Sequence, residues 1–230
     1  MEAQPLDGTT LHGLDAYLLR RWDRILEQAA EHLVVVALSV GIAAAIGIAI
    51  GALVWNRPFP RSVSLGVAGV LITIPSLALL GLLIPVLGIG WTPTVVSLVL
   101  YALLPIVRNT VVGLREVPAA VMESALGMGY TRTQTLLRVQ LPMAWPVIIT
   151  GIRVSTQLIV GIATVAAYVS GPGLGNDIFQ GLASLGSINA LNRTFVATVC
   201  VVVLALLLDA LFILIRRSTT PRGIRVRPAA

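Results

Sequence analysis

Long apolar runs, separated by short polar stretches, dominate the chain. A helix needs about 20 apolar residues to cross a bilayer, and the runs predict five spans. The uncharged stretch 62–107 is too long for one span and breaks at the Pro- and Gly-containing stretch 85–93. Pro75 and Pro105 fall inside spans, where they predict kinks. We therefore expect an all-α integral membrane fold with spans at about 33–54, 63–84, 94–112, 143–169 and 194–215.

The first 32 residues have a different pattern. Between residues 14 and 31, apolar side chains recur every three or four positions and charged ones occupy the rest, which is typical of an amphipathic helix. We expect this amphipathic helix to lie along the membrane surface, and because its charges nearly balance it is a poor signal for retention in the cytoplasm. Its apolar stripe consists of Leu14, Leu18, Trp22, Ile25 and Ala29.

Composition agrees with a membrane protein. Hydrophobic residues make up 57% of the chain, charged residues 11%, and the mean hydropathy is +0.92. A soluble domain carries roughly 25% charged residues, so a cytosolic enzyme, a secreted disulfide scaffold and a disordered chain are excluded. Lysine is absent, so the chain lacks a Walker A phosphate loop, and any ATP chemistry belongs to a partner. Cys200 is the only cysteine, and His12 and His32 have no partners at metal-ligand spacing, so no metal site is predicted.

The net charge of +6 indicates membrane orientation rather than nucleic-acid binding, because the arginines cluster at the ends of apolar runs. Positive residues accumulate on the cytoplasmic side, and the segment 218–230 is basic. The C-terminus is therefore expected in the cytoplasm and the N-terminus outside a bacterial cytoplasmic membrane. This divides the chain into an extracytoplasmic segment 1–32, a membrane domain 33–217 and a cytoplasmic tail 218–230. The segment 113–142 lies inside and 170–193 outside.

The predicted cytoplasmic segment has a readable local structure. Pro118 suits the first turn of a helix, and Gly129 is placed to end it in a left-handed conformation. Thr131 and Gln134 have the spacing of a capping box, so a second short helix should run to about Gln140 and end at Pro142. A packed connector would explain the helices but not the length of the segment.

The motif in this segment resembles the Glu-Ala-Ala loop of bacterial ABC importer permeases. Glu123-Ser124-Ala125 is followed by Gly129 and by Val139-x-Leu141-Pro142, with Ser and Val replacing Ala and Ile of that pattern. The resemblance implies the type I ABC importer permease fold and a coupling helix that docks on an ATPase subunit. The residues expected to couple are Glu123, Ser124, Ala125, Gly129, Tyr130 and Thr131.

Three further stretches, 73–80, 101–110 and 171–175, are similar to the osmoprotectant permeases. This resemblance implies import of glycine betaine, carnitine, choline or proline betaine. It also implies a second permease subunit (the same chain or a sister permease), two cytoplasmic ABC ATPases and an extracytoplasmic substrate-binding protein. No cofactor is expected on this chain; ATP and Mg²⁺ belong to the ATPases.

Three other functions stay open at this stage. An importer of an amino acid or another small zwitterion would share the same architecture. An ion-coupled carrier would want internal repeats and midplane ionisable groups, and no repeat is visible. A membrane enzyme would need convergent acid and base groups, but the predicted topology separates Asp177 from Glu123.

Polar residues inside the spans are candidates for a translocation path or for helix-to-helix hydrogen bonds. They are Thr73, Ser76, Asn109, Thr156, Gln157, Thr164 and Tyr168. Arg153 and Asp209 carry opposite charges at compatible depths, so we expect them to form an intramembrane ion pair. Arg108 is a rival partner for Asp209, and an unpaired, snorkelling Arg153 is the alternative.

Overall fold

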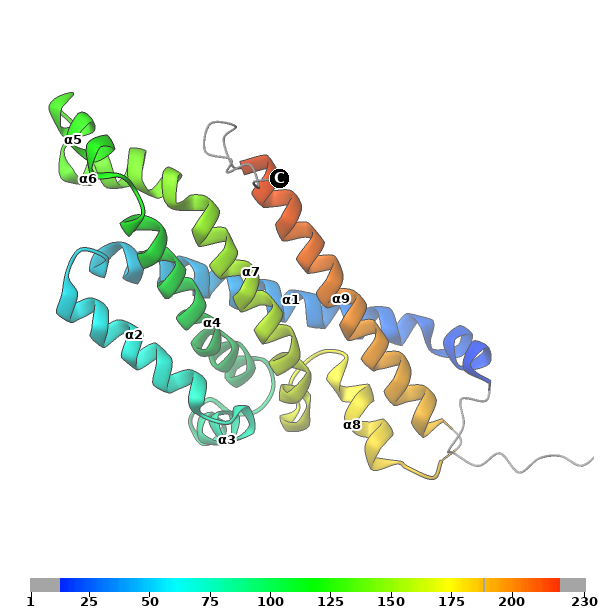
Figure 1. The fold of residues 1–230 in the computed structure, drawn as a ribbon. Coiled ribbons are helices and arrows are strands. Elements are labelled where there is room, and N and C mark those ends of the chain that lie inside the picture. The colour runs from blue at the N-terminus through cyan, green and yellow to red at the C-terminus, as the bar shows by residue number, and fades with distance from the viewer. Residues whose placement is uncertain (1–12, 188, 220–230) are drawn as a thin grey trace, which may run out of the picture. The chain divides into compact units, whose positions relative to one another are not determined.

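A computed structural model describes residues 13–187 and 189–219, and all regular elements in these ranges are helical (Figure 1). The predicted all-α class is confirmed. The basic tail and the first 12 residues, including His12, lie outside the described residues. The elements are α1 Leu14–Val54, α2 Pro58–Thr73, α3 Ser76–Leu87, α4 Trp91–Arg115, α5 Ala119–Gly127, α6 Arg132–Thr135, the π-helix η1 Leu136–Gln140, α7 Leu141–Ala166, the 3₁₀ turn η2 Ala167–Val169, α8 Gly175–Ala183 and α9 Ala190–Thr219.

Four helical segments in the described part of the chain are long and apolar enough to cross a membrane: Leu14–Val54, Trp91–Arg115, Arg132–Val169 and Ala190–Thr219. The pair α2 and α3 passes the same test as a broken span, which gives up to five spans. The number of expected spans is therefore matched when the broken pair counts as one.

The second predicted span is broken rather than kinked. α2 ends at Thr73, α3 begins at Ser76, and Pro75 caps α3 in an extended conformation (φ −58°, ψ 135°). Proline disfavours helical geometry in the residue before it and has no N–H to donate. The next break is shorter than the expected 85–93, because α3 includes Pro85. It lies at Gly88 and Gly90, both at positive φ.

The N-terminal amphipathic stretch is also different from the expectation. It is not a separate surface helix, because α1 runs without interruption from Leu14 to Val54. No proline lies within it, and its apolar stripe packs on protein: Tyr17 and Ile25 form a buried cluster with Val196 of α9. Trp22, which was placed on the stripe, is exposed. Burial of Tyr17 and Ile25 against α9 contributes to the stability of this part of the helix.

The chain divides into two compact units. Unit 1 consists of Met1–Ser39, Ile74–Leu98 and Ile159–Leu207, and unit 2 of Val40–Thr73, Val99–Leu158 and Leu208–Ala230. Four long helices contribute to both units, so each unit draws its packing from segments far apart in the sequence.

In unit 2, glycines let α4 approach two other helices closely. A Cβ at Gly47 or Gly51 of α1 would meet Ile106 at 2.7 Å or Thr110 at 2.6 Å. A Cβ at Gly151 of α7 would lie 2.6 Å from Cβ of Asn109. The Gly-x-x-x-Gly spacing in α1 therefore serves helix packing, as small residues do in membrane bundles.

Candidate functional site

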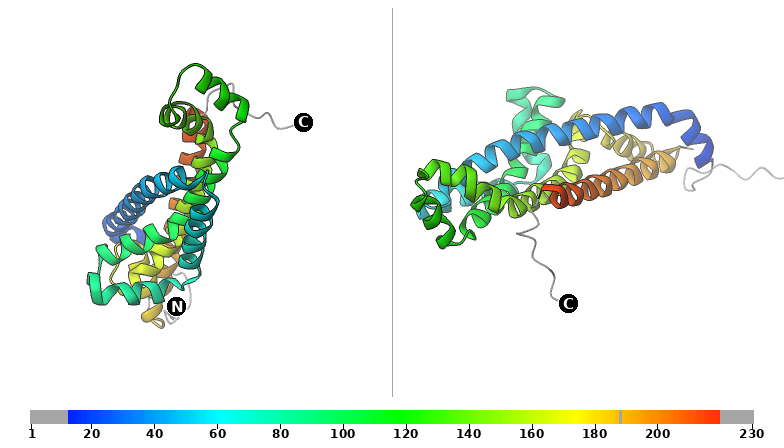
Figure 2. Two further views of the ribbon diagram at one scale, coloured as in Figure 1. Left: turned by 90° about the vertical axis from the view of Figure 1, so that its left-hand side faces the viewer. Right: turned by 90° about the horizontal axis from the view of Figure 1, so that it is seen from above.

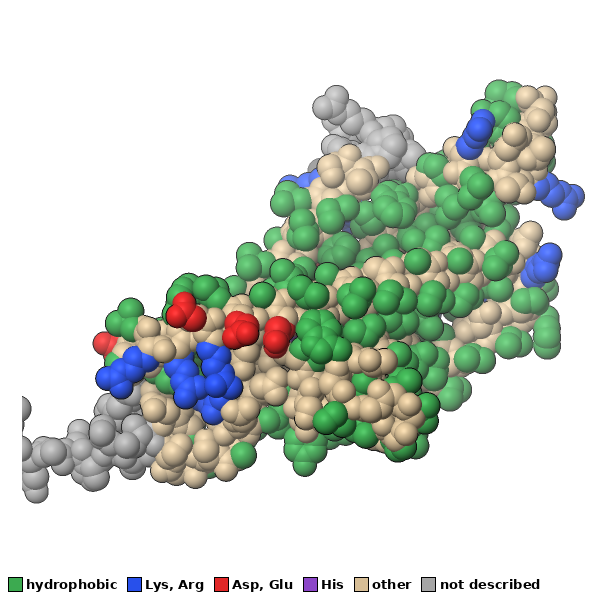
Figure 3. All heavy atoms as spheres, turned by 180° about the vertical axis from the view of Figure 1, so that it is seen from behind, with side chains coloured by type: hydrophobic (Ala, Val, Ile, Leu, Met, Phe, Trp, Pro, Cys, Tyr) green, Lys and Arg blue, Asp and Glu red, His purple; other side chains and the backbone are tan. Residues whose placement is uncertain are grey.

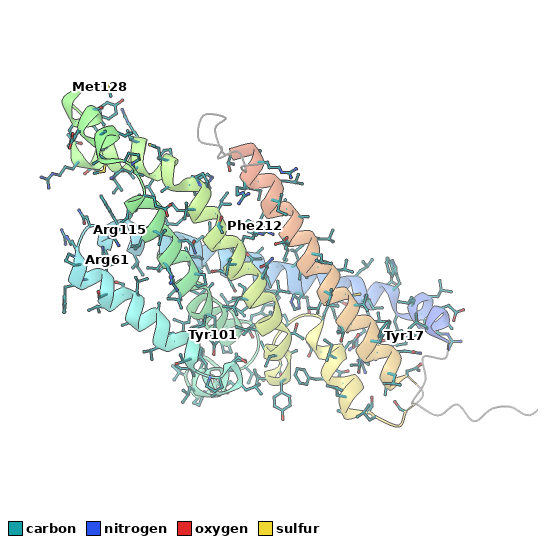
Figure 4. All side chains as sticks on the ribbon, viewed as in Figure 1. Tyr17, Arg61, Tyr101, Arg115, Met128 and Phe212 are labelled. Carbon is teal, nitrogen blue, oxygen red and sulfur yellow. The ribbon has the colours of Figure 1, made fainter. Side chains whose placement is uncertain are left out.

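The most exposed connection in unit 2 is Glu116–Thr131, which we call the α5 segment. Figure 2 shows it standing beyond the end of α4, and Met128, which is 71% exposed, lies at its tip (Figure 4). α5 begins after Pro118, whose extended backbone (φ −60°, ψ 136°) caps the helix. One face of α5 packs inward through the buried Ala125, while Glu123 and Ser124 are exposed.

The end of α5 is a Schellman motif built around Gly129. The N–H of Tyr130 donates to the carbonyl of Ala125 at 3.1 Å, and the N–H of Gly129 donates to that of Leu126 at 2.9 Å. Gly129 has φ +88°, which glycine adopts without steric cost. The expected left-handed stop at Gly129 is confirmed.

The predicted capping box is also present. The hydroxyl of Thr131 accepts from the N–H of Gln134 at 3.2 Å, and the Gln134 side chain accepts from the N–H of Thr131 at 2.9 Å. Both bonds satisfy backbone donors that the first turn of a helix leaves free. Thr131 is exposed and Tyr130 half-buried.

The second short helix does not end at Pro142, contrary to the expectation. α6 continues through the π-helix η1 into α7, so Arg132–Val169 forms one helical segment. A proline inside an α-helix clashes with the carbonyl four residues earlier. The wider π turn at Leu136–Gln140 ends two residues before Pro142. It changes which backbone carbonyl lies opposite the proline ring. The segment between spans is therefore shorter than the expected 113–142, since α4 runs to Arg115 and the helix resumes at Arg132.

The two charges expected inside the spans meet. Nε of Arg153 donates to Oδ1 of Asp209 at 2.6 Å and an Nη donates to Oδ2 at 2.7 Å, which is a two-pronged guanidinium–carboxylate pair. Nε2 of Gln157 also donates to Asp209. Arg108, the rival partner, is exposed in α4, seven residues before the helix ends at Arg115. The pair joins α7 to α9 within unit 2 across 56 residues.

The other polar residues proposed for a path mostly bond to their own helices. The hydroxyls of Thr73, Thr156 and Thr164 donate to carbonyls of the preceding turn at 2.7, 2.9 and 3.3 Å. The Asn109 amide donates to Pro105 at 2.8 Å, beside the proline inside α4. Ser76 begins α3, and the exposed Tyr168 contacts Phe179 edge-on at 5.3 Å. Of these seven, Gln157 is the one bonded to a side chain of another span.

Sequence reasoning missed a cluster in unit 1 around the connection after η2. The Glu31 carboxylate accepts from the N–H of Gly173 at 3.1 Å, and Nε2 of His32 lies 3.2 Å from the carbonyl of Val160. A Cβ at Gly173 would come within 2.9 Å of His32. The sequence carried a partial signal, a polar Glu-His pair at the start of an apolar run, but not the partner 142 residues away.

An ion cluster holds α8 in the same unit. Nε of Arg193 donates to Oδ1 of Asp177 at 2.7 Å, Arg193 also bonds Gln180, and Arg24 lies 4.0 Å from the same oxygen. The Asp177 side chain is 2% exposed, so its charge is compensated inside the protein. The charged side chains of α1 form a patch against a largely apolar surface (Figure 3).

No group of three or more His, Cys, Asp or Glu side chains converges on a metal position within residues 13–187 and 189–219. The described residues offer helices of membrane-spanning length, a short exposed helix, one buried ion pair at Asp177 and one half-buried pair at Asp209. Such parts can bind partners and undergo rearrangement.

Residues 38–221 match the family described as the binding-protein-dependent transport system inner membrane component. The choline transport system permease protein OpuBB of Bacillus subtilis is 33% identical over 217 residues, covering 94% of this chain and 97% of that protein. The osmoprotectant import permease protein OsmW of Salmonella typhimurium is 36% identical over 214 residues, covering 91% and 98%. The carnitine transport permease protein OpuCB of Listeria monocytogenes is 40% identical over 158 residues, covering 69% and 72%.

The fold agrees with that of solved importers. A chain of the MetNI methionine ABC transporter, determined in inward-facing conformations, superposes with a TM-score of 0.76 at 26% identity, over 86% of this chain and 96% of that chain. A chain of an amino acid ABC transporter, crystallised with histidines, superposes with a TM-score of 0.71 at 16% identity, over 88% and 97%, and shows the fold alone. With the capped α5 segment between helices of membrane-spanning length, these matches lead to one conclusion: the chain belongs to the family of binding-protein-dependent transport system inner membrane components.

Proposed function

We propose that this chain, with a second permease subunit, forms the translocation path of an ATP-driven importer for small osmoprotectants such as glycine betaine, carnitine, choline or proline betaine. The observation that carries the substrate class is the set of relatives named for choline, carnitine or osmoprotectant transport, two of which align over more than 90% of both chains. Unlike an enzyme, the chain contributes no catalytic residue in this proposal.

In this proposal the α5 segment is the part of the chain that contacts the ATPase. Glu123, Ser124, Gly129 and Thr131 are exposed, while Ala125 is buried and Tyr130 is half-buried. α5 begins after Pro118 and is capped at its C-terminal end by the Schellman bonds, so an ATPase can displace it as a rigid piece. Because α6 continues into α7, a displacement at Arg132 is transmitted directly to the helix that carries Arg153.

The orientation follows from charge. Arg57, Arg61, Arg115, Arg132 and Arg138 all lie in the connections that the predicted topology places inside. We therefore place the C-terminus and the α5 segment in the cytoplasm, and the N-terminus and the cluster around Asp177 outside. ATP and Mg²⁺ act on two ATPase subunits, and a substrate-binding protein delivers the cargo from outside.

The seven candidate path residues, from Thr73 to Tyr168, differ in how well they are placed to contact a substrate. Gln157 is exposed and bonded to the Arg153–Asp209 pair, so it is the strongest candidate to meet a substrate. Thr156 is buried and bonded to its own helix, which favours a packing role. Polar groups that already have intrahelical partners contribute little to binding a substrate.

Transport in reconstituted vesicles tests the proposal. The chain is co-expressed with its partner ATPase and binding protein, and ATP-dependent uptake of radiolabelled choline, carnitine, glycine betaine and methionine is compared. Saturable uptake of the first three, abolished without ATP or without the binding protein, is the expected result. Uptake of methionine alone would instead support the alternative, an amino-acid importer, which the likeness to the MetNI permease favours.

A further inference from the structure

A cavity of about 520 Å³ lies in unit 2 beside the base of α5. One wall is the end of α1 and the turn after it, and the other is formed by α5, α6 and η1. We call it the Arg57–Arg132 pocket. It is lined by Ala52, Leu53, Trp55, Asn56, Arg57, Met122, Leu126, Arg132, Thr133, Thr135, Leu136 and Gln140.

The pocket carries an uncompensated positive charge. Arg57 comes from one wall and Arg132 from the other, and none of the lining residues is acidic. No carboxylate in the described part of the chain lies within ion-pair distance of either guanidinium. Two arginines that face one cavity without a counter-charge repel each other and favour an anion between them. A guanidinium binds the oxygens of a phosphate with two parallel hydrogen bonds.

Six of the ten other lining residues are apolar, and the lining reaches the edge of a span; the polar ones are Asn56, Thr133, Thr135 and Gln140. Leu53, which is 71% exposed, and Leu126, which is 46% exposed, stand beside the arginines. The apolar run of α1 ends at Val54, and Trp55 follows directly, as tryptophans do at the membrane–water interface. The cavity thus offers a cationic end and an apolar wall at headgroup depth. An amphiphilic anion fits both, whereas a free phosphate uses only the arginines.

We propose that the Arg57–Arg132 pocket binds the headgroup phosphate of an anionic phospholipid, such as phosphatidylglycerol, from the cytoplasmic leaflet. The leaflet follows from the orientation proposed above. The bound phosphate bridges the turn after α1 and the start of α6. Nε2 of Gln140 reaches Sδ of Met122 at 2.9 Å in the same lining, so the bridge also restrains the base of α5. Lipid composition would thereby control how firmly the α5 segment is held.

The first test needs no variant. The purified full-length chain in detergent is titrated with phosphatidylglycerol, phosphatidylcholine or inorganic phosphate, and retained lipid is counted by native mass spectrometry alongside the thermal midpoint. We expect phosphatidylglycerol to be retained at one molecule per chain and to raise the midpoint, and the other two additions to do neither. Equal retention of both lipids would overturn the proposal, and so would displacement of phosphatidylglycerol by millimolar phosphate.

The second test compares two double variants with the same change of charge. Arg57→Gln with Arg132→Gln should weaken phosphatidylglycerol binding about twenty-fivefold, because each arginine near an anionic headgroup contributes roughly fivefold. Arg115→Gln with Arg138→Gln removes two exposed arginines outside the pocket and should bind like the wild type. Equal affinities of the two double variants would refute the site.

A partner protein is the competing occupant. If the pocket accepts an acidic segment of the ATPase, the Arg57→Gln/Arg132→Gln variant loses ATPase binding in lipid-free detergent while lipid retention is unchanged. That result would overturn the lipid assignment. Both tests are independent of transport, so failure to import osmoprotectants would refute the proposed function and leave the lipid measurements interpretable.

Discussion

Two connections between spans differ in how they are built. The α5 segment, Glu116–Thr131, is largely exposed, and apart from the bond from Gln140 to Met122 its hydrogen bonds join residues at most five positions apart. The connection 170–181 is largely buried, with Gly171–Gly175 and Asp177 inaccessible to solvent. It is held by Glu31 and Arg193, residues from α1 and α9.

The difference indicates different roles. A segment stabilised by its own caps keeps its shape while its outer face stays free for a partner, as a coupling helix requires. The 170–181 connection is held by buried charges and by glycines in close contact with other helices. It cannot move without losing those contacts. We infer that motion enters unit 2 through the α5 segment, while the 170–181 connection serves as a fixed part of unit 1.

The largest effect should follow a charge reversal on the free face of α5. Glu123→Arg should abolish ATP-driven uptake, because the proposed function has its exposed carboxylate contact the ATPase, while the permease stays folded. Glu116→Arg, an equally exposed reversal before α5, is the control and should retain uptake. Substrate-stimulated ATP hydrolysis in proteoliposomes measures both. Normal coupling in the Glu123 variant would show that α5 is only a connector.

The next largest effect concerns the buried charge of the other connection. Asp177→Asn should destabilise the protein by about 3–5 kcal/mol, because Arg193 loses its partner inside the protein. Asp15→Asn, at an exposed position of α1, should change little. Thermal midpoints in detergent give the comparison. Similar midpoints for the two variants would mean that the 170–181 connection is not held by this pair.

The Arg153–Asp209 pair offers a long-range contact inside unit 2 for comparison. Arg153→Asp and Asp209→Arg should each lower the thermal midpoint, and the double swap should recover part of the loss, because opposite charges again face each other. Additive losses without recovery would argue that the two side chains act independently in the membrane.

A smaller loss is expected where a side chain is forced into the packed connection. A Cβ at Gly175 would lie 2.1 Å from the carbonyl oxygen of Thr164, so Gly175→Ala should cost about 1–3 kcal/mol through backbone displacement. Gly161→Ala, in a helix with open space around the added carbon, is the matched control. A loss of the same size in both would point to a general effect of glycine replacement in helices.

The smallest effect on stability should come from replacing Gly129, the glycine that ends α5. Gly129 has open space but φ +88°, so Gly129→Val is strained by about 1–2 kcal/mol without any clash. The strain should misdirect α6 and weaken ATPase capture in a pull-down, while the thermal midpoint falls by only a few degrees. A large drop in the midpoint with unchanged capture would reverse the roles that we assign to the two connections.

Local features of this protein were readable without a structure. Apolar runs located the spans, since transfer of a continuous apolar helix into lipid depends on composition alone. The Gly129 stop and the Thr131–Gln134 box were predicted correctly, because capping bonds join residues a few positions apart. The motif around Glu123 was enough to identify the family.

Tertiary structure decided what depends on helix rotation and on distant neighbours. Proline in a span predicts a kink or a break equally well, and packing made Pro75 a break while a π turn carried the helix past Pro142. The membrane depths estimated from the sequence left both Arg108 and Arg153 as possible partners for Asp209. The side of α7 that faces α9 made Arg153 the partner. The Gly173 N–H and the Glu31 carboxylate are 142 residues apart in the sequence. Local sequence preferences could not predict this hydrogen bond, because it forms only when separate helices pack into one unit.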